Sequence, residues 1–367
     1  MFTGNIQSIR KTCCAVIIDG DCAIVVDYTG TKVHWTRDHW DAVQMAIELV
    51  ARNGGGKVEL GPGTYKLKKT LTVPSNVALV GAGPATRLVP EFGGPVIEVT
   101  DASNIKVGDF AIVDEGAITN TFAIVLDCVS KSSIFGIYLR NVFGVLQLRS
   151  TVTNTNPTRM NIVSGIVAED VRHRAVEVQE DVSYCKLSDI YIRNAEGSEN
   201  GIVLDSTLGG VGLGQREGNK LSNITVLSAG GLGIYIKEWT DLQLTNITVE
   251  ESKLDGIVIE ADTKTATRIY IINAKSRNNG GNGLKITGTA TAKATNIIYI
   301  GDLSKNGNYG AFLQYCEKVR IYATADENTA GKISIGTEVT NLHYVLSDEA
   351  YADQALPTYI HTLTVQA

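Results

Sequence analysis

Short apolar segments recur at similar intervals along most of the chain. From residue 97 onward, the pattern apolar–any–apolar, usually after a glycine, returns every 22 to 32 residues. The first inward position of each segment is Ile97, Ile124, Leu146, Val176, Ile202, Ile234, Ile257, Leu284, Ala311 or Ile333. A repeat of ~20–30 residues that contains short strands is typical of a β-solenoid. The pattern therefore predicts an all-β, single-stranded parallel β-helix, a rod on the order of 50 Å long at ~4.8 Å per stacked strand.

A second strand is predicted before each of the later segments. It begins at Ile190, Ile224, Ile247 and Ile269, and it often follows Ser-Asp, Ser-Asn or Thr-Asn. The connecting turns are rich in asparagine and glycine, which tolerate left-handed backbone angles at tight corners. An ordinary β-sandwich is the alternative, because it also contains many short strands, but it does not require glycine-then-aliphatic strands at this longer period.

The N-terminal part of the chain carries two other patterns. Residues 12–27 form two β-rich runs around Asp19-Gly20-Asp21, which predicts a β-hairpin. Residues 38–52 have helical periodicity that ends at Gly54-Gly55-Gly56. The expected apolar face of the helix is Ala42, Met45, Ala46, Leu49 and Val50. A helix here would cover the open end of the apolar tube. We therefore expect a hairpin or attachment segment in 1–36, helix and coils in 37–339, and a C-terminal cap or oligomerisation segment in 340–367.

Composition excludes some classes of partner. The 367 residues include 37 glycines but only 7 prolines, and the formal net charge is −6. There is no lysine- or arginine-rich run, so we expect neither nucleic acid nor an anionic membrane surface as partner. No apolar stretch approaches the ~20 residues that cross a bilayer, so we expect no membrane insertion. The first residues do not have the pattern of a signal peptide.

The six cysteines do not suggest a metal site. They form no CxxC pair, and none is accompanied by a histidine cluster. A chain of this length does not need disulfides for stability, so we expect free, mostly buried thiols.

A predicted helix that begins Asp41-Ala42-Val43-Gln44 is followed by three segments in a fixed order. These are Gly54-Gly55-Gly56-Lys57-Val58-Glu59-Leu60, Gly61-Pro62-Gly63-Thr64-Tyr65 and Val77-Ala78-Leu79-Val80-Gly81-Ala82-Gly83. With these features, residues 41–90 resemble the N-terminal module of the pectate-lyase-like superfamily, which includes phage tailspikes and extracellular polysaccharide enzymes.

The resemblance implies a right-handed β-helix, a homotrimer, work on glycans, and a place outside the cell or on a virion surface. The chain has no Gly-His-Gly, Asn-Thr-Asp or Asp-Pro-His-Asp motif, and only five histidines. We therefore expect a tailspike-like or surface protein that binds polysaccharide as an attachment or structural component. The alternative is a polysaccharide-degrading enzyme, either a glycoside hydrolase or a lyase. No cofactor is expected, except Ca²⁺ if the protein is a lyase.

Two long intervals in the repeat indicate where a site could lie. The additional residues fall in 150–164 and 206–220, both after the same type of strand and on either side of the coil that contains Glu177. Long loops on a rigid scaffold often carry function. The outward side chains between these loops are Arg149, Glu177, Gln179 and Asp205.

These residues fit two kinds of catalysis. Glu177 and Asp205, with Cα atoms roughly 8 Å apart, could serve as the acids of a hydrolase. In a lyase, Arg149 would act as base or charge neutraliser, and Gln179 would contact substrate in either case. The alternative is an ordinary solvated surface, on which exposed ion pairs have little effect.

Outward aromatic residues could bind sugar or a second subunit. Tyr235 and Phe312 are expected on the outer face, with Trp239 just after Tyr235. Aromatic rings stack on sugars, and an apolar outer face, here Tyr235, Val258 and Phe312, also suits a subunit interface. The run 169–174 is the densest ionisable cluster, and we expect it to be a solvated turn in which His173 could act as a base.

Overall fold

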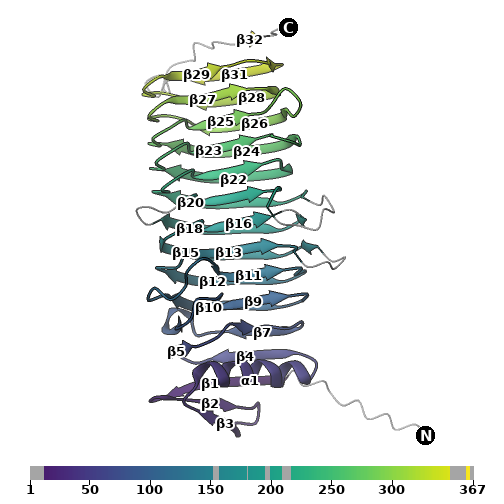
Figure 1. The fold of residues 1–367 in the computed structure, drawn as a ribbon, viewed down its shortest axis with the longest axis vertical. Coiled ribbons are helices and arrows are strands. Elements are labelled where there is room, and N and C mark those ends of the chain that lie inside the picture. Colours follow the sequence, from purple (N-terminus) through teal and green to yellow (C-terminus); the bar gives the residue numbers. More distant parts are fainter. Residues whose placement is uncertain are drawn as a thin grey trace, which may run out of the picture.

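The computed structural model describes residues 12–151, 157–179, 181–194, 199–208, 216–347 and 361–363. The strands stack into one long rod, from the N-terminal end in purple to the C-terminal end in yellow (Figure 1). Strands of successive coils pair in parallel along the rod. The fold is therefore the expected parallel β-helix, and the alternative β-sandwich is excluded.

Two large sheets and one small sheet make up the rod. The 11-stranded sheet contains β6 (Leu71–Thr72), β9 (Ile97–Thr100), β11 (Phe122–Asp127), β13 (Gly144–Arg149), β16 (Val176–Gln179), β19 (Ile202–Asp205), β21 (Ile234–Lys237), β23 (Ile257–Glu260), β25 (Leu284–Thr287), β27 (Tyr309–Gln314) and β29 (Gly331–Ile335). The 19-stranded sheet contains β1 (Thr12–Asp19), β2 (Cys22–Val26), β3 (Lys32–Thr36), β4 (Gly56–Leu60), β5 (Gly63–Leu67), β7 (Val77–Val80), β8 (Thr86–Pro90), β10 (Lys106–Val113), β12 (Ser133–Arg140), β15 (Ile162–Val171), β18 (Lys186–Asn194), β20 (Lys220–Leu227), β22 (Thr240–Glu250), β24 (Ala266–Arg277), β26 (Ala294–Asp302), β28 (Cys316–Thr324), β30 (Val339–Thr340), β31 (Leu342–Ser347) and β32 (His361–Leu363). The small sheet pairs β14 (Thr158–Arg159) with β17 (Val182–Ser183).

The ten inward positions expected from the sequence lie in register in the 11-stranded sheet. Each is the direct partner of the next, from the Ile97–Ile124 pair at one end to the Ala311–Ile333 pair at the other. All of them except Ile333 are buried in one continuous apolar core. Burying one such side chain stabilises the fold by about 1.5–3 kcal/mol, so the column is a major source of stability.

The second series of strands is aligned differently from expectation at one coil. Ile190, Ile224 and Ile247 are partners, as expected. Ile269 was expected next, but it pairs with Leu242, and Ala274 is the partner of Ile247. The asparagines Asn246 and Asn273 set this register, because each has positive φ and the Asn273 Nδ2 donates to the Asn246 Oδ1 at 2.7 Å.

Two columns of left-handed residues bend the 19-stranded sheet. One runs from Asn76 and Asn104 to Lys318 and Asn341, and the other from Asp109 to Asn273. Gly, Asn and Asp adopt this conformation with the least strain, which explains why Asn and Asp recur in both columns, although Lys318 and a few other residues also adopt it. The bends divide the strands of this sheet between two faces of the rod.

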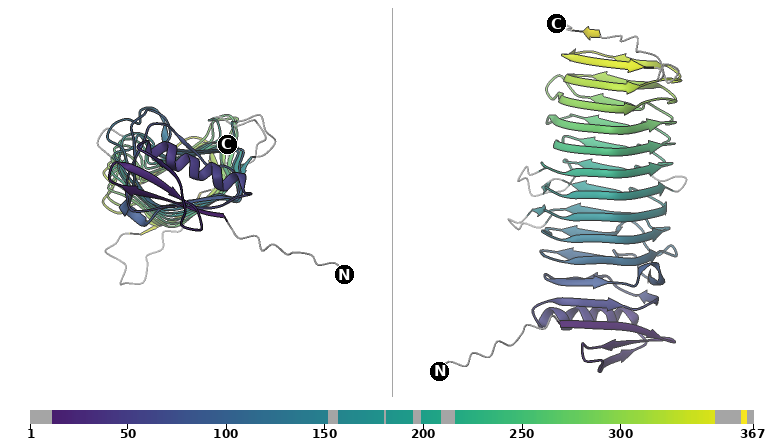
Figure 2. Two further views of the ribbon diagram at one scale, coloured as in Figure 1. Left: turned by 90° about the horizontal axis from the view of Figure 1, so that it is seen from below. Right: turned by 180° about the vertical axis from the view of Figure 1, so that it is seen from behind.

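The N-terminal elements close one end of the rod. β1 and β2 form the expected antiparallel hairpin, and β3, which was not expected, pairs with β2. Helix α1 (His39–Arg52) begins after Asp38, whose side chain accepts hydrogen bonds from the N–H groups of Trp40 and Asp41. The helix lies across the end of the tube (Figure 2, left).

The buried face of α1 differs in part from the expected one. Ala42, Ala46 and Val50 are buried, but Val43 and Ile47 complete the face, whereas Met45 is exposed. The expectation for Met45 was wrong, because the apolar stripe of the helix packs against β1 and β4 and Met45 lies outside this stripe.

Parallel strand pairing includes elements near both ends of the described chain. β1 pairs in parallel with β4, so the hairpin is part of the first layer of the rod. β31 pairs in parallel with β28 and so continues the stack.

No helix within the described ranges is long and apolar enough to cross a membrane. The thiols of Cys13, Cys14, Cys22, Cys185 and Cys316 are free, and Cys14, Cys128, Cys185 and Cys316 are buried, as expected.

Candidate functional site

The expected site lies on the outer surface of the 11-stranded sheet, which we call the network face. Glu177 is the partner of Gln147 on β13 and of Val203 on β19. Asp205 is the partner of Gln179 on β16 and of Lys237 on β21. The outward columns therefore follow the order predicted from the sequence.

Glu177 is buried rather than exposed. It is 4% accessible, and Gln147 Nε2 and Gln179 Nε2 donate to its Oε1 at 2.8 and 2.7 Å. Arg174 Nη1 donates to its Oε2 at 2.7 Å. The expectation of a solvated carboxylate was wrong, because neighbouring side chains on the same face use both oxygens. Arg174, three residues earlier, was the sequence signal for this pairing.

Arg149 is held by a second acid that the sequence reasoning missed. Its Nε lies 2.9 Å from Asp127 Oδ2 on β11, and its Nη1 donates to Gln147 Oε1 at 3.0 Å. Burial acts to raise the pKa of Asp127, but hydrogen bonds from Thr151 and the charge of Arg149 outweigh it, so this pKa lies below its ordinary value. Asp127 is the direct partner of Arg149 in register, so extending the outward column by one coil would have identified it.

The carboxylate of Asp205 has a different set of hydrogen-bond partners from that of Glu177. It is 7% accessible, so it too is buried, contrary to expectation. Its Oδ1 accepts hydrogen bonds from the N–H and hydroxyl groups of Thr207 at 2.8 and 2.6 Å. The two carboxylates occupy different lateral positions, opposite Val203 and Gln179 respectively, and no described residue donates to both.

Gln179 has an unsatisfied acceptor. It is 9% accessible and donates through Nε2 to Glu177, but its Oε1 is buried without a hydrogen-bond partner among the described residues. An unpaired buried polar group is costly, and a functional site is one explanation for it.

Tyr235 lies at the centre of a charged cluster with Asp205, Lys237, Glu260 and Asp262, which we call the Tyr235 cluster. Lys237 Nζ is 3.6 Å from Glu260 Oε1 and 3.4 Å from Asp262 Oδ2. Burial, and then the carboxylate of Glu260, raise the pKa of Tyr235 far above its ordinary value. The half-buried ring therefore carries a neutral hydroxyl among three acids and an ammonium group.

The other expected aromatics differ from each other. Phe312 is half-buried on the same face as Tyr235, and Lys285 separates it from Val258 in the column. Val258 is 3% accessible and contributes little to the outer surface. Trp239 is completely buried in the core, so the expectation that it contacts substrate was wrong. It follows β21 at the point where the chain turns inward.

Both long intervals begin beside the coil of Glu177, as expected. β13 and β19 are the two neighbours of β16, and residues 150 and 206 follow their ends. Ser150 links the two ends of the first long interval to the next coil. Its hydroxyl donates to Asp181 O at 3.0 Å and accepts from Thr158 N at 2.9 Å. Residues 152–156 and 209–215 lie outside the described part of the chain.

The run 169–174 is more ordered than the expected solvated turn. His173 stacks on Phe143 with ring centroids 4.5 Å apart, and burial is the main cause that lowers its pKa. Arg172 Nη2 lies 2.5 Å from the buried Asp114 carboxylate. Within the described residues, no group of three or more His, Cys, Asp or Glu side chains could hold a metal ion.

Comparison with known proteins supports the fold. A sequence model of the family described as right handed beta helix region matches residues 135–299. The A-module of mannuronan C-5 epimerase AlgE4 from Azotobacter vinelandii is similar in structure, with a TM-score of 0.64 at 14% identity over 84% of this chain and 90% of that one.

The catalytic domain of a GH87 α-1,3-glucanase, solved with nigerose, has a TM-score of 0.65 at 12% identity over 84% of this chain and 66% of that one. A search of curated protein sequences finds no significant match. At these identities the similarity concerns the fold, and this chain is a right-handed parallel β-helix.

Proposed function

We propose that the protein binds a polysaccharide on its network face, at the Tyr235 cluster, as a tailspike-like or surface attachment component. The observation that carries this proposal is the half-buried Tyr235 ring flanked by Asp205, Lys237 and Glu260. An aromatic surface beside charged groups suits a sugar, which has an apolar ring face and hydroxyls at its edge. Two of the structural neighbours are a mannuronan C-5 epimerase and an α-1,3-glucanase, which act on polysaccharides, and this supports the class of ligand.

Cleavage is the second candidate, and the arrangement of the acids favours binding over it. General acid–base catalysis needs a carboxyl group that can reach the substrate. Glu177 uses both oxygens within the protein, and Asp127 is paired with Arg149. Asp205, Glu260 and Asp262 are the remaining acids near Tyr235. A lyase at this face would also need Ca²⁺ or Arg149 to neutralise the substrate carboxylate.

Binding to a panel of acidic and neutral polysaccharides tests the proposal, with Tyr235→Leu as the variant. Loss of the ring should weaken binding about tenfold, equivalent to ~1.4 kcal/mol, in line with the contribution of an aromatic contact plus its buried area. Tyr191→Leu is the matched control, because Tyr191 is also half-buried and outward but lies on the other sheet. Equal binding by Tyr235→Leu and the parent would contradict the proposal.

The same panel separates binding from cleavage. New reducing ends would indicate a hydrolase, and ultraviolet absorbance from unsaturated sugar ends would indicate a lyase. We expect neither product.

We also propose that the protein assembles as a homotrimer, with its location outside the cell or on a virion surface. Four apolar side chains are exposed close together on β24, β26 and β28, namely Tyr270, Ile272, Ile300 and Tyr322. Exposed apolar patches of this kind suit a subunit interface better than the column of Tyr235, Val258 and Phe312. A monomer in light scattering at micromolar concentration would contradict the assembly.

A further inference from the structure

A column of outward lysines runs along the 19-stranded sheet, on a different side of the rod from the network face. Lys57, Ala78 and Lys106 are successive partners on β4, β7 and β10. Ser133 and Ile162 occupy the next two coils, and three coils beyond Lys106 the column continues with Lys186 on β18 and its partner Lys220 on β20. We call the positions from Lys57 to Lys220 the lysine column. No acidic residue occupies any of them, although the chain has 39 acidic and 33 basic residues.

Most of these ammonium groups are free. Lys106, Lys186 and Lys220 are exposed and form no ion pair with any described residue, whereas Lys57 Nζ lies 2.5 Å from Glu59 Oε1. Lys186 and Lys220 are direct partners on adjacent strands, and the spacing of the strands places their Cα atoms ~4.8 Å apart. Like charges in this position are destabilising, so an anionic ligand would relieve a repulsion that the protein otherwise retains.

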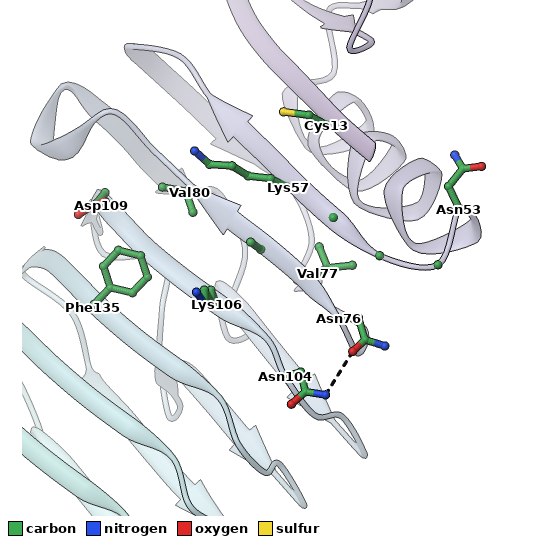
Figure 3. Close-up of a pocket in the computed structure, with 14 residues that line it drawn as sticks. Cys13, Asn53, Lys57, Asn76, Val77, Val80, Asn104, Lys106, Asp109 and Phe135 are labelled. Carbon is green, nitrogen blue, oxygen red and sulfur yellow. Dashed lines mark hydrogen bonds between the residues drawn. The ribbon is translucent and has the colours of Figure 1, made fainter. Parts of the chain in front are cut away.

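A groove of about 790 Å³ lies at the N-terminal end of the column (Figure 3). Lys57 and Lys106 line it, and Ala78 between them leaves the space open. Phe135 also lines the groove, and its ring leans over Gly108, where an added Cβ would lie 2.9 Å from two ring carbons. Asp109 is the one acidic side chain that lines the groove among the described residues.

We propose that the lysine column binds a carboxylated polysaccharide that lies along the rod axis, with one sugar unit in the groove against Phe135. The aromatic ring would meet the apolar face of the sugar, and Lys106 would bind its carboxylate. A single file of cations suits one thin chain, whereas duplex nucleic acid needs a broad basic surface, and this chain carries a net charge of −6. This inference takes from the proposed function only that the ligand is a polysaccharide. The site itself is independent, because the lysine column and the network face lie on different sheets.

Affinity gel electrophoresis with polygalacturonate, alginate and hyaluronate tests the proposal. Methyl-esterified polygalacturonate, which has the same backbone without the charge, is the ligand control. The Lys106→Gln/Lys220→Gln variant should bind the acidic polymers about tenfold more weakly, because two charge-assisted contacts are lost. Phe135→Ala should weaken binding in the same direction, and added salt should weaken the parent's binding. Lys275→Gln is the matched control. Lys275 is exposed on the same sheet, but it follows the bend at Asn273 and so lies on another side of the rod.

Three outcomes would overturn the proposal. They are equal binding of the methyl ester, undiminished binding by the double lysine variant, and retardation by DNA in place of the acidic polysaccharides. Surface lysines tolerate glutamine, so misfolding does not obscure the result. If Tyr235→Leu abolishes binding while the lysine variant binds normally, the lysine column is wrong and the network face remains the site. The reverse pattern supports the lysine column and removes the network face.

Discussion

Arg174 and Glu177 form an ion pair of 2.7 Å that neutralises a carboxylate almost fully buried on the outer surface of the rod. Two glutamines complete the contacts of the same carboxylate. Gln147 lies on the preceding coil, whereas Gln179 and Arg174 belong to the same coil as Glu177, so the Glu177 carboxylate links two neighbouring coils. Its position explains why substitution there should affect folding before it affects a ligand.

We expect Glu177→Gln to lower the free energy of unfolding by about 1–3 kcal/mol, because the variant places an amide N–H group among donors and leaves Arg174 less well paired. Chemical denaturation measures the change. Glu199→Gln is the control, since Glu199 is also a partner of Arg174 but its side chain is half exposed, and its loss should cost less than about 1 kcal/mol. Unchanged stability of Glu177→Gln would show that the buried network is not a structural element.

Stability should also depend on the ionisation of Asp127. Its pKa is lower in the folded protein than its ordinary value of 3.8, despite burial, because Thr151 and Arg149 favour the charged form. Its contribution is therefore complete above about pH 4 and is lost as the pH falls through the folded pKa. Asp127→Asn should flatten this part of the acid-unfolding curve, followed by circular dichroism. The exposed Asp101→Asn is the control, and an identical acid response of the two variants would contradict the assignment.

The continuous core makes a strong prediction at Ile234. We expect Ile234→Asp to abolish folding, because an unpaired buried charge costs several kcal/mol and both neighbours in the column are aliphatic. Ile234→Val should lose only about 0.5–1.5 kcal/mol. The measurement is the yield of soluble protein and its thermal unfolding. Soluble, heat-resistant Ile234→Asp would show that the column is not the core.

The buried cysteines should be chemically protected. Burial raises the pKa of Cys185 to about 11 and that of Cys316 to about 12, so both remain thiols at mildly alkaline pH. We expect iodoacetamide to leave them unmodified in the native protein and to modify them after denaturation. Peptide mass spectrometry measures each site, with the half-buried Cys22 as the internal comparison. Rapid native labelling of Cys185 would indicate that the coils around it open.

The sequence was sufficient to predict the coil register, because inward aliphatic residues such as Ile202 and Ile234 must stack in order to be buried. It was not sufficient at Ile269, where the strand lengthens. The asparagine ladder of Asn223, Asn246 and Asn273 would have corrected the alignment.

The burial of Glu177, Asp205 and Trp239 could not be predicted from alternation alone. Alternation assigns a side chain to a face, but neighbouring side chains decide whether that face is exposed to water. For Glu177, those neighbours are Gln147, Gln179 and Arg174.

A structure of the chain with a bound oligosaccharide tests the central claim most directly. The fragment should come from a polysaccharide that the protein retains in the binding panel. The account predicts a sugar ring against Tyr235, with hydroxyls near Asp205, Lys237 and Glu260 on the network face. An oligosaccharide bound only away from the Tyr235 cluster, for example between subunits, would contradict it.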